Sequence, residues 1–121
     1  MSFAASVYAM LHLLPLKDQK EVYEKFVFEP GRAVSEIGFW FFDVKSAAKV
    51  DEATMTWPVL VVSGAKNRIT PAAMIKKVAV KYQTVATYKE FENHAHGVLS
   101  EPHWENIATF ISDWLTSEIK S

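Results

Sequence analysis

The second half of the chain combines one solid apolar run with segments of helical and mixed periodicity. Residues 59–62 are an unbroken run of branched apolar side chains between a proline and a glycine, which predicts a strand buried on both faces. Thr70 and Pro71 supply an N-cap and a first helical proline for a helix that follows the run. Residues 84–91 are rich in β-forming side chains but more polar, which predicts a second strand nearer a sheet edge. Together these segments predict one βαβ unit, expected to be right-handed.

Helical periodicity marks both ends of the chain. The last helix is predicted to begin near Pro102. Its wide apolar face comprises Trp104, Ile107, Ala108, Phe110, Ile111, Trp114 and Leu115. At the other end, apolar residues spaced i, i+3, i+4 and i+7 predict a first helix that Pro15 ends, and Asp18 is placed to cap a second helix. A third helix is predicted through residues 34–44 and a short fourth one over residues 46–50.

The densest aromatic group in the chain is the run Phe-Trp-Phe-Phe at residues 39–42. A core cluster is the simpler interpretation, because aromatic side chains bury much apolar surface. The alternative is a pocket for a small apolar ligand, lined by Phe39, Trp40 and Phe42. Both interpretations stay open at this point.

The pattern as a whole predicts an α/β fold in a single domain over residues 1–121, with a helical part over 1–56 and a β-α-β-α unit over 57–121. Two parallel strands do not make an independently stable sheet, and a strand that is apolar on both faces needs neighbours on both edges. A second copy of the same chain is the simplest source of such neighbours. We therefore expect a homodimer in which dimerisation completes the sheet, with an interface rich in aromatic residues.

Composition narrows the range of partners. The 121 residues are 50% hydrophobic and 22% charged, and the net charge is −1. This balance gives no electrostatic reason to expect nucleic acid or an anionic membrane as partner. The absence of cysteine excludes a thiolate catalyst, a disulfide framework and a zinc–thiolate site. No apolar run approaches the roughly 18 residues of a membrane span, and the first basic residue is Lys17, so no signal peptide is expected and a cytoplasmic location is assigned by default.

Two linked motifs resemble segments of the α/β-hydrolase superfamily. Residues 58–64 read Pro-Val-Leu-Val-Val-Ser-Gly and are followed by a polar residue three positions later and by Ile-Thr-Pro, which resembles the acid-bearing segment of that family. Further along, residues 94–97 read His-Ala-His-Gly, and Glu-Pro at residues 101–102 opens a helix that ends in Asp-Trp-Leu. This second motif resembles the histidine-bearing segment. The order, acid before histidine, is the order of the family.

The resemblance covers most of the chain and implies the C-terminal half of a hydrolase fold. The helices predicted before Asp51 are then similar to the cap that is inserted ahead of the acid-bearing strand. By the same resemblance, His96 takes the position of the catalytic histidine and Asn67 the position of the catalytic acid.

The sequence departs from the family at two members of the catalytic triad. The nucleophile elbow, G-x-S-x-G, is missing, because no two of the four glycines lie four positions apart. At the acid position, the neutral amide of Asn67 is a poor substitute for a carboxylate that orients the histidine and stabilises the imidazolium. The equivalent Asp-to-Asn change in a serine protease lowers turnover about 10⁴-fold. The loop that supplies the family's oxyanion hole also has no counterpart in the sequence.

His96 is the residue most expected to take part in chemistry, because a polar loop after the second strand places it at the carboxyl edge of the sheet. A loop histidine that merely bonds backbone is an equal alternative. The other histidines and glutamates of this loop also suggest a metal cluster, but H-x-H spacing alone is weak evidence, so no metal and no cofactor is expected. Glu101 and Asp113 are expected to serve the start and surface of the last helix, and Asn67 to bond loop backbone.

Three functional interpretations follow. The favoured one is a hydrolase-like C-terminal module that lacks hydrolase activity on its own and binds a small apolar ligand beneath the aromatic run at residues 39–42. The second is a hydrolase for an ester or other acyl substrate, with His96 as general base in a site completed across the homodimer. The third is one half of a split hydrolase whose separate partner chain carries the nucleophile. Whether the chain is an enzyme is left open by the sequence.

Overall fold

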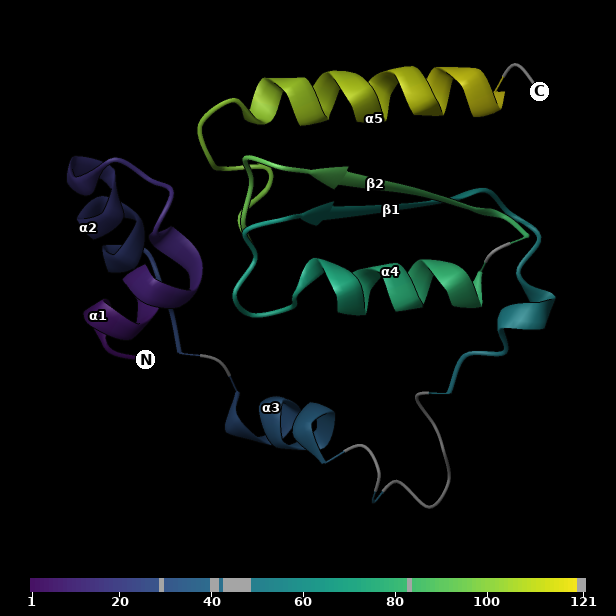
Figure 1. The fold of residues 1–121 in the computed structure, drawn as a ribbon. Coiled ribbons are helices and arrows are strands. Elements are labelled where there is room, and N and C mark those ends of the chain that lie inside the picture. The colour runs from purple at the N-terminus through teal and green to yellow at the C-terminus, as the bar shows by residue number, and fades with distance from the viewer. Residues whose placement is uncertain (29, 40–41, 43–48, 83, 120–121) are drawn as a thin grey trace.

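The fold is a small mixed α/β arrangement in which two parallel strands lie between two helices (Figure 1). The computed structural model describes residues 1–28, 30–39, 42, 49–82 and 84–119. Strand β1 (Val59–Gly64) pairs in parallel with β2 (Ala86–Phe91). Helix α4 (Ala72–Lys81) covers one face of this sheet and α5 (Trp104–Ile119) covers the other. The predicted β-α-β-α order of the second half is confirmed.

Successive side chains of each strand lie on opposite faces of the sheet, so they face α4 and α5 in turn. The pairing runs from Val59 opposite Ala86 to Gly64 opposite Phe91. Tyr88 lies on the α4 side, where its hydroxyl is 3.4 Å from the carbonyl oxygen of Ala72. Phe91 lies on the α5 side, with its ring centroid 5.7 Å from that of Phe110 in an edge-to-face arrangement. The sheet is therefore the middle layer of three.

The strand predicted to be buried on both faces is only half-buried. Residues 59–62 are of intermediate exposure, and only Ser63 and Gly64 are buried. Among the described residues β1 pairs with β2 alone, so the opposite edge of β1 has no strand beside it. One helix on each face of a two-stranded sheet does not cover such a strand completely, which is why the expectation of full burial fails.

The N-terminal helices differ from the prediction in their boundaries. Helix α1 (Phe3–Ser6) continues directly into a π-helical turn, η1 (Val7–Leu11), so the helix predicted to reach Pro15 ends earlier. Helix α2 (Leu16–Glu24) begins directly after Pro15 rather than at a cap on Asp18. Proline supplies the fixed backbone angle suited to a helix start, which explains the earlier boundary. The side chain of Gln19 then donates to the carbonyl of Leu14 at 3.0 Å and ties the connection to the helix.

The middle of the chain carries short helices. Helix α3 (Gly31–Gly38) is followed, after residues that lie partly outside the described ranges, by a 3-10 turn, η3 (Glu52–Thr54). Helix α3 ends at Gly38, short of the predicted end at residue 44, and residues 40–41 and 43–44 of that prediction lie outside the described residues. Most of the predicted fourth helix, residues 46–48, lies outside the described residues, and residues 49–50 have no regular structure.

The described core is sparse for a chain of this length. Its buried apolar side chains are those of Leu11, Ala79, Ala95 and Ile107, of which only Ala95 and Ile107 have no exposed surface. Many large apolar side chains stay exposed, among them Trp57, which is 76% exposed. Exposed apolar surface on this scale is typical of a chain that meets a partner. In the part of the chain that the structure describes, no helix is long and apolar enough to cross a membrane.

Candidate functional site

The loops that follow β1 and β2 meet at the carboxyl ends of the two strands. The backbone N–H of Ala65 donates to the carbonyl of Phe91 at 3.0 Å, and that of Lys66 donates to the carbonyl of His94 at 2.9 Å. Gly64 packs directly against the backbone of His94 and Ala95, so closely that a Cβ at this position would overlap both carbonyl groups. The segments that carry Asn67 and His96 are thus adjoining parts of one edge, where parallel sheets place their ligands.

Asn67 uses its side-chain amide inside its own loop. Its Oδ1 accepts the backbone N–H groups of Ile69 at 3.0 Å and Thr70 at 3.1 Å, and its Nδ2 donates to the hydroxyl of Thr70 at 2.9 Å. The expectation that Asn67 bonds loop backbone is confirmed. Thr70 accepts this bond instead of capping the helix as predicted, and Pro71 occupies the N-cap of α4. Among the described residues, Asn67 and His96 share no hydrogen bond.

His96 is half-buried, and its Nδ1 atom is buried without a hydrogen-bond partner among the described residues. In a working triad, a carboxylate on the nitrogen farther from the nucleophile fixes the tautomer and the orientation of the ring. No described side chain does this for His96. The structure therefore places His96 at the expected edge of the sheet but gives it no orienting partner.

The loop that carries His96 is shaped by Glu101, a role that the sequence did not reveal. The side chain of Glu101 is 2% exposed. One carboxyl oxygen accepts the N–H of Ala95 at 2.7 Å, and the other accepts the N–H of Gly97 at 2.8 Å. The prediction that Glu101 serves the start of the last helix is wrong, because α5 begins only at Trp104 and the carboxyl group turns back into the loop. A Glu-Pro pair before a helix is so common a start signal that it concealed this role.

His94 lies beside the same carboxyl group. Its side chain is 5% exposed, its Nδ1 is 3.5 Å from Glu101 Oε2, and its ring packs edge-on against Phe91 with 6.0 Å between centroids. At 3.5 Å the pair falls short of a hydrogen bond of ordinary length. Among the residues with described positions, no group of three or more histidine, aspartate or glutamate side chains is placed to hold a metal ion.

A second polar cluster lies on the α4 face of the sheet. The hydroxyl of Tyr88 donates to Glu90 Oε2 at 2.8 Å and lies 3.0 Å from Ser63 Oγ. Because the phenol has a single proton, Ser63 is the donor in the second contact. Burial raises the pKa of Tyr88 above 10.0; the Ser63 hydrogen bond lowers it in part, and Glu90 raises it further. Ser63 is buried and bonded, so its hydroxyl is not arranged as a free nucleophile.

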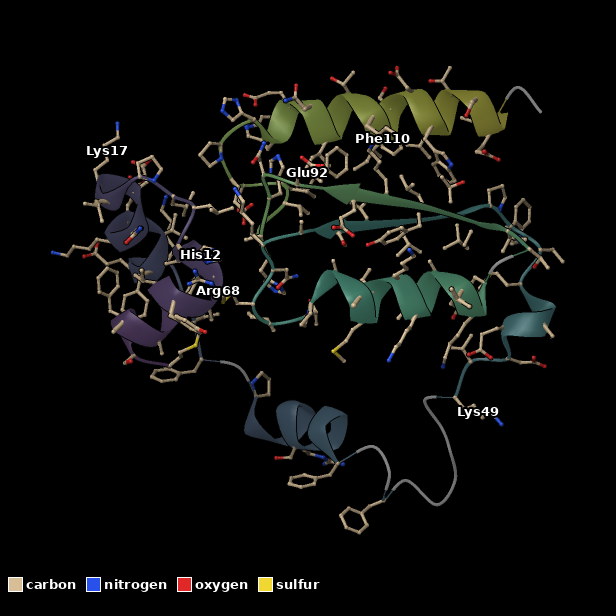
Figure 2. The ribbon with its side chains drawn as sticks, in the orientation of Figure 1. His12, Lys17, Lys49, Arg68, Glu92 and Phe110 are labelled. Atoms are coloured by element: carbon tan, nitrogen blue, oxygen red, sulfur yellow. The ribbon has the colours of Figure 1, made fainter. Side chains whose placement is uncertain are left out.

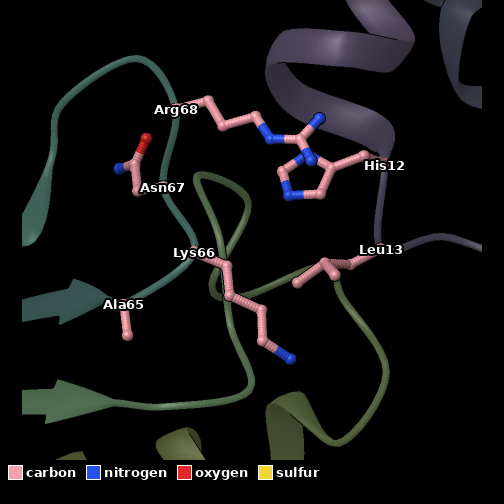
Figure 3. A pocket seen from close by; sticks show the side chains of 6 residues that line it. All are labelled: His12, Leu13, Ala65, Lys66, Asn67 and Arg68. Atoms are coloured by element: carbon pink, nitrogen blue, oxygen red, sulfur yellow. The ribbon is translucent and has the colours of Figure 1, made fainter.

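An open cavity of about 590 Å³ separates the N-terminal helices from the loop after β1 (Figure 3). Its lining consists of His12, Leu13, Ala65, Lys66, Asn67 and Arg68. Arg68 fixes the two sides together, because its Nη1 donates to the carbonyl of Tyr8 at 3.0 Å and its guanidinium carbon lies 4.7 Å from the centre of the Tyr8 ring. Figure 2 shows His12 and Arg68 in the same region, beside the edge that carries both loops.

The residues predicted to bind an apolar ligand lie elsewhere. Phe39 is 58% exposed and Phe42 is 71% exposed, and their ring centroids are 6.3 Å apart. Neither residue lines the cavity between the N-terminal helices and the loop after β1. Trp40, the third predicted residue, lies outside the described residues.

Comparison of the whole chain with protein-family models, with curated proteins and with solved structures finds no match in any of the three. The function is therefore argued from the geometry of this chain.

Proposed function

We propose that the chain is an α/β-hydrolase-like C-terminal module that lacks hydrolase activity on its own. The observation that supports this proposal is the meeting of the Asn67 and His96 loops at the carboxyl ends of two parallel strands. Arg68, in the loop at the same edge, bonds to Tyr8 and so holds the N-terminal helices beside this edge, as a cap would be held. The order of the elements and the position of the edge agree with the resemblance in the sequence.

Four features argue that the module does not hydrolyse esters by itself. The amide of Asn67 is committed to Ile69 and Thr70, and His96 Nδ1 has no described partner. The sequence contains no G-x-S-x-G elbow to present a serine, and Ser63 is committed to Tyr88. An imidazole without an orienting acid and without a nucleophile to deprotonate gives little acceleration of acyl transfer.

A binding role fits the aromatic run better than a core role does. Phe39 and Phe42 present most of their surface to solvent, which is costly unless a ligand or partner covers it. Phe39 and Phe42 offer a surface for the small apolar ligand that the sequence suggested for Phe39, Trp40 and Phe42. The module is then a binding protein built on a hydrolase-like half-fold.

We expect the wild-type chain to hydrolyse a panel of activated short-chain esters no faster than buffer does. His96→Ala should behave identically, because no described group orients His96 for catalysis. The measurement is the initial rate with p-nitrophenyl acetate and butyrate. His103→Asn is the control for a histidine outside the site, since asparagine tolerates the positive φ of 68° at this position. Turnover that disappears in His96→Ala but persists in His103→Asn would contradict the proposal.

That contrary result would favour a second candidate function, a hydrolase whose site is completed by another chain. Among the residues that the structure describes, His96 Nδ1 has no hydrogen-bond partner and one edge of β1 is unpaired, and both observations point to groups supplied from outside. A second copy of this chain, or a separate chain that carries the nucleophile, would place a strand beside β1 and a carboxylate or serine near His96. The substrate would be an ester or another acyl compound.

We expect the purified chain to be a homodimer at micromolar concentration. The open edge of β1 and exposed apolar side chains such as Trp57 leave much surface that a second copy would cover. Sedimentation equilibrium over a concentration series should fit twice the mass of one chain. A stable, folded monomer throughout the micromolar range would rule out the dimer and leave a different chain as the partner.

A further inference from the structure

We propose that the cavity between the N-terminal helices and the loop after β1 binds a small organic carboxylate. Its walls carry two basic side chains, Lys66 and Arg68, and an imidazole, His12, whereas none of the described residues that line it is an aspartate or a glutamate. Leu13 and Ala65 add apolar surface for the body of such a ligand. This inference goes beyond the proposed function, because the ligand it concerns is anionic rather than apolar and the charged groups that would bind it, Lys66 and Arg68, are not triad positions, although Asn67 also lines the cavity.

The positive charges of the cavity are bonded to neutral groups only. Lys66 Nζ donates to the amide oxygen of Asn93 at 3.1 Å, and Arg68 Nη1 donates to the backbone carbonyl of Tyr8. Among the described residues, neither side chain forms an ion pair with a carboxylate. Basic side chains on one concave surface, with no carboxylate paired to them, raise the local concentration of an anion.

The basic groups are also held in place before a ligand arrives. The bond to Tyr8 and the stacking over its ring fix the guanidinium of Arg68 in one orientation. The loop that carries Lys66 and Arg68 is locked by the three hydrogen bonds of Asn67 and by the bond from Lys66 N to His94 O. Groups that are already ordered lose little conformational entropy on binding, which strengthens the interaction.

The chemistry of the walls favours a carboxylate. A guanidinium has several N–H donors in a planar fork that matches the two oxygens of a carboxylate. Arg68 commits one of its nitrogens to Tyr8 and retains further donors for a ligand. His12 lines the same cavity, and its Nδ1 has no hydrogen-bond partner among the described residues. A ligand with one carboxylate and a short apolar body would contact both the basic and the apolar side chains of the cavity.

The test is calorimetric or NMR titration of the full-length chain with sodium benzoate, with neutral benzamide as the matched probe and with inorganic phosphate. We expect benzoate to bind with a dissociation constant on the order of 1 mM. Benzamide should bind at least about tenfold more weakly, because it lacks the charge. Lys66→Gln and Arg68→Gln should each weaken benzoate binding about fivefold, and the double variant roughly 25-fold if the two effects add.

Lys76→Gln is the matched control, because Lys76 is an exposed lysine on α4 that does not line the cavity. Its affinity for benzoate should equal that of the wild type. Equal binding of benzoate and benzamide, equal affinity of the double variant and the control, or binding of phosphate without benzoate would overturn the proposal. Lys66→Gln keeps the test informative if loss of Arg68 disturbs the N-terminal helices, because the side chain of Lys66 is exposed and makes its one described bond to Asn93. None of these variants alters His96, so failure here leaves the ester test unaffected.

Discussion

Replacement of Gly64 by alanine is expected to lower the free energy of unfolding by about 3 kcal/mol or more. A Cβ at this position would overlap the carbonyl groups of His94 and Ala95, which are backbone atoms and cannot move aside as a flexible side chain can. Gly64 is the last residue of β1, and the histidine-bearing loop packs on it. The substitution therefore forces apart the two segments that form the candidate site.

The measurement is urea unfolding followed by far-UV circular dichroism, with Gly38→Ala as the matched control. No described atom lies within 4 Å of the Cβ that this control adds, and Gly38 is helical. Alanine there should leave stability unchanged or raise it by up to about 1 kcal/mol, because alanine has the higher helix propensity. If Gly64→Ala unfolded at the same urea concentration as Gly38→Ala, the close packing of the histidine-bearing loop on β1 would be disproved.

Local patterns predicted the elements of the second half well. The apolar run at residues 59–62, the periodic segment that became α4 and the aromatic face of α5 are each determined by neighbours in sequence. Such signals are strong because a helix or strand needs only a few consecutive residues to express its period. The parallel pairing of β1 with β2 also followed, since a helix between two strands gives a parallel neighbour.

Contacts within a folded-back loop, and contacts between distant segments, were beyond the same reasoning. The bonds from Ala95 and Gly97 to Glu101, and the stacking of Arg68 over Tyr8, depend on how distant or folded-back segments meet. Nothing in the spacing of these residues distinguishes a buried carboxyl group from a helix-start glutamate. The N-terminal boundaries failed for a more local reason: the structure forms a π-helical turn at Val7–Leu11, where the sequence predicts an ordinary helix.

The candidate site was predicted in location but not in detail. The sequence placed Asn67 and His96 at one edge, and the structure places their loops in contact. The sequence also predicted that Asn67 bonds loop backbone, which the bonds to Ile69 and Thr70 confirm, but it did not show that Glu101 holds the other loop. An asparagine in a turn is a recognisable signal, whereas a glutamate that accepts backbone N–H groups leaves little trace in residue type.

Glu101→Gln is expected to lower the free energy of unfolding by about 2–3 kcal/mol. The glutamine side chain has the same shape, but its amide nitrogen is a donor. Its single remaining oxygen can accept only one of the two N–H groups. The other N–H group, either that of Ala95 or that of Gly97, then faces the amide nitrogen, which is itself a donor, in a buried place. Leaving a buried N–H unpaired is costly because water cannot replace the lost partner.

Two measurements separate this loop-holding role from a general loss of stability. Urea unfolding should show the destabilisation in Glu101→Gln and a change within about 0.5 kcal/mol in Glu105→Gln, an exposed glutamate in the first turn of α5. Native-state hydrogen exchange should show the amide of Ala95 or Gly97 exchanging faster in Glu101→Gln, while amides in the middle of α5 change only as far as global stability changes. Either unchanged protection of both amides or equal stability of the two variants would contradict the proposed role of the Glu101 carboxyl group. The histidine-bearing loop would then be held by the packing of Ala95 against Gly64 alone.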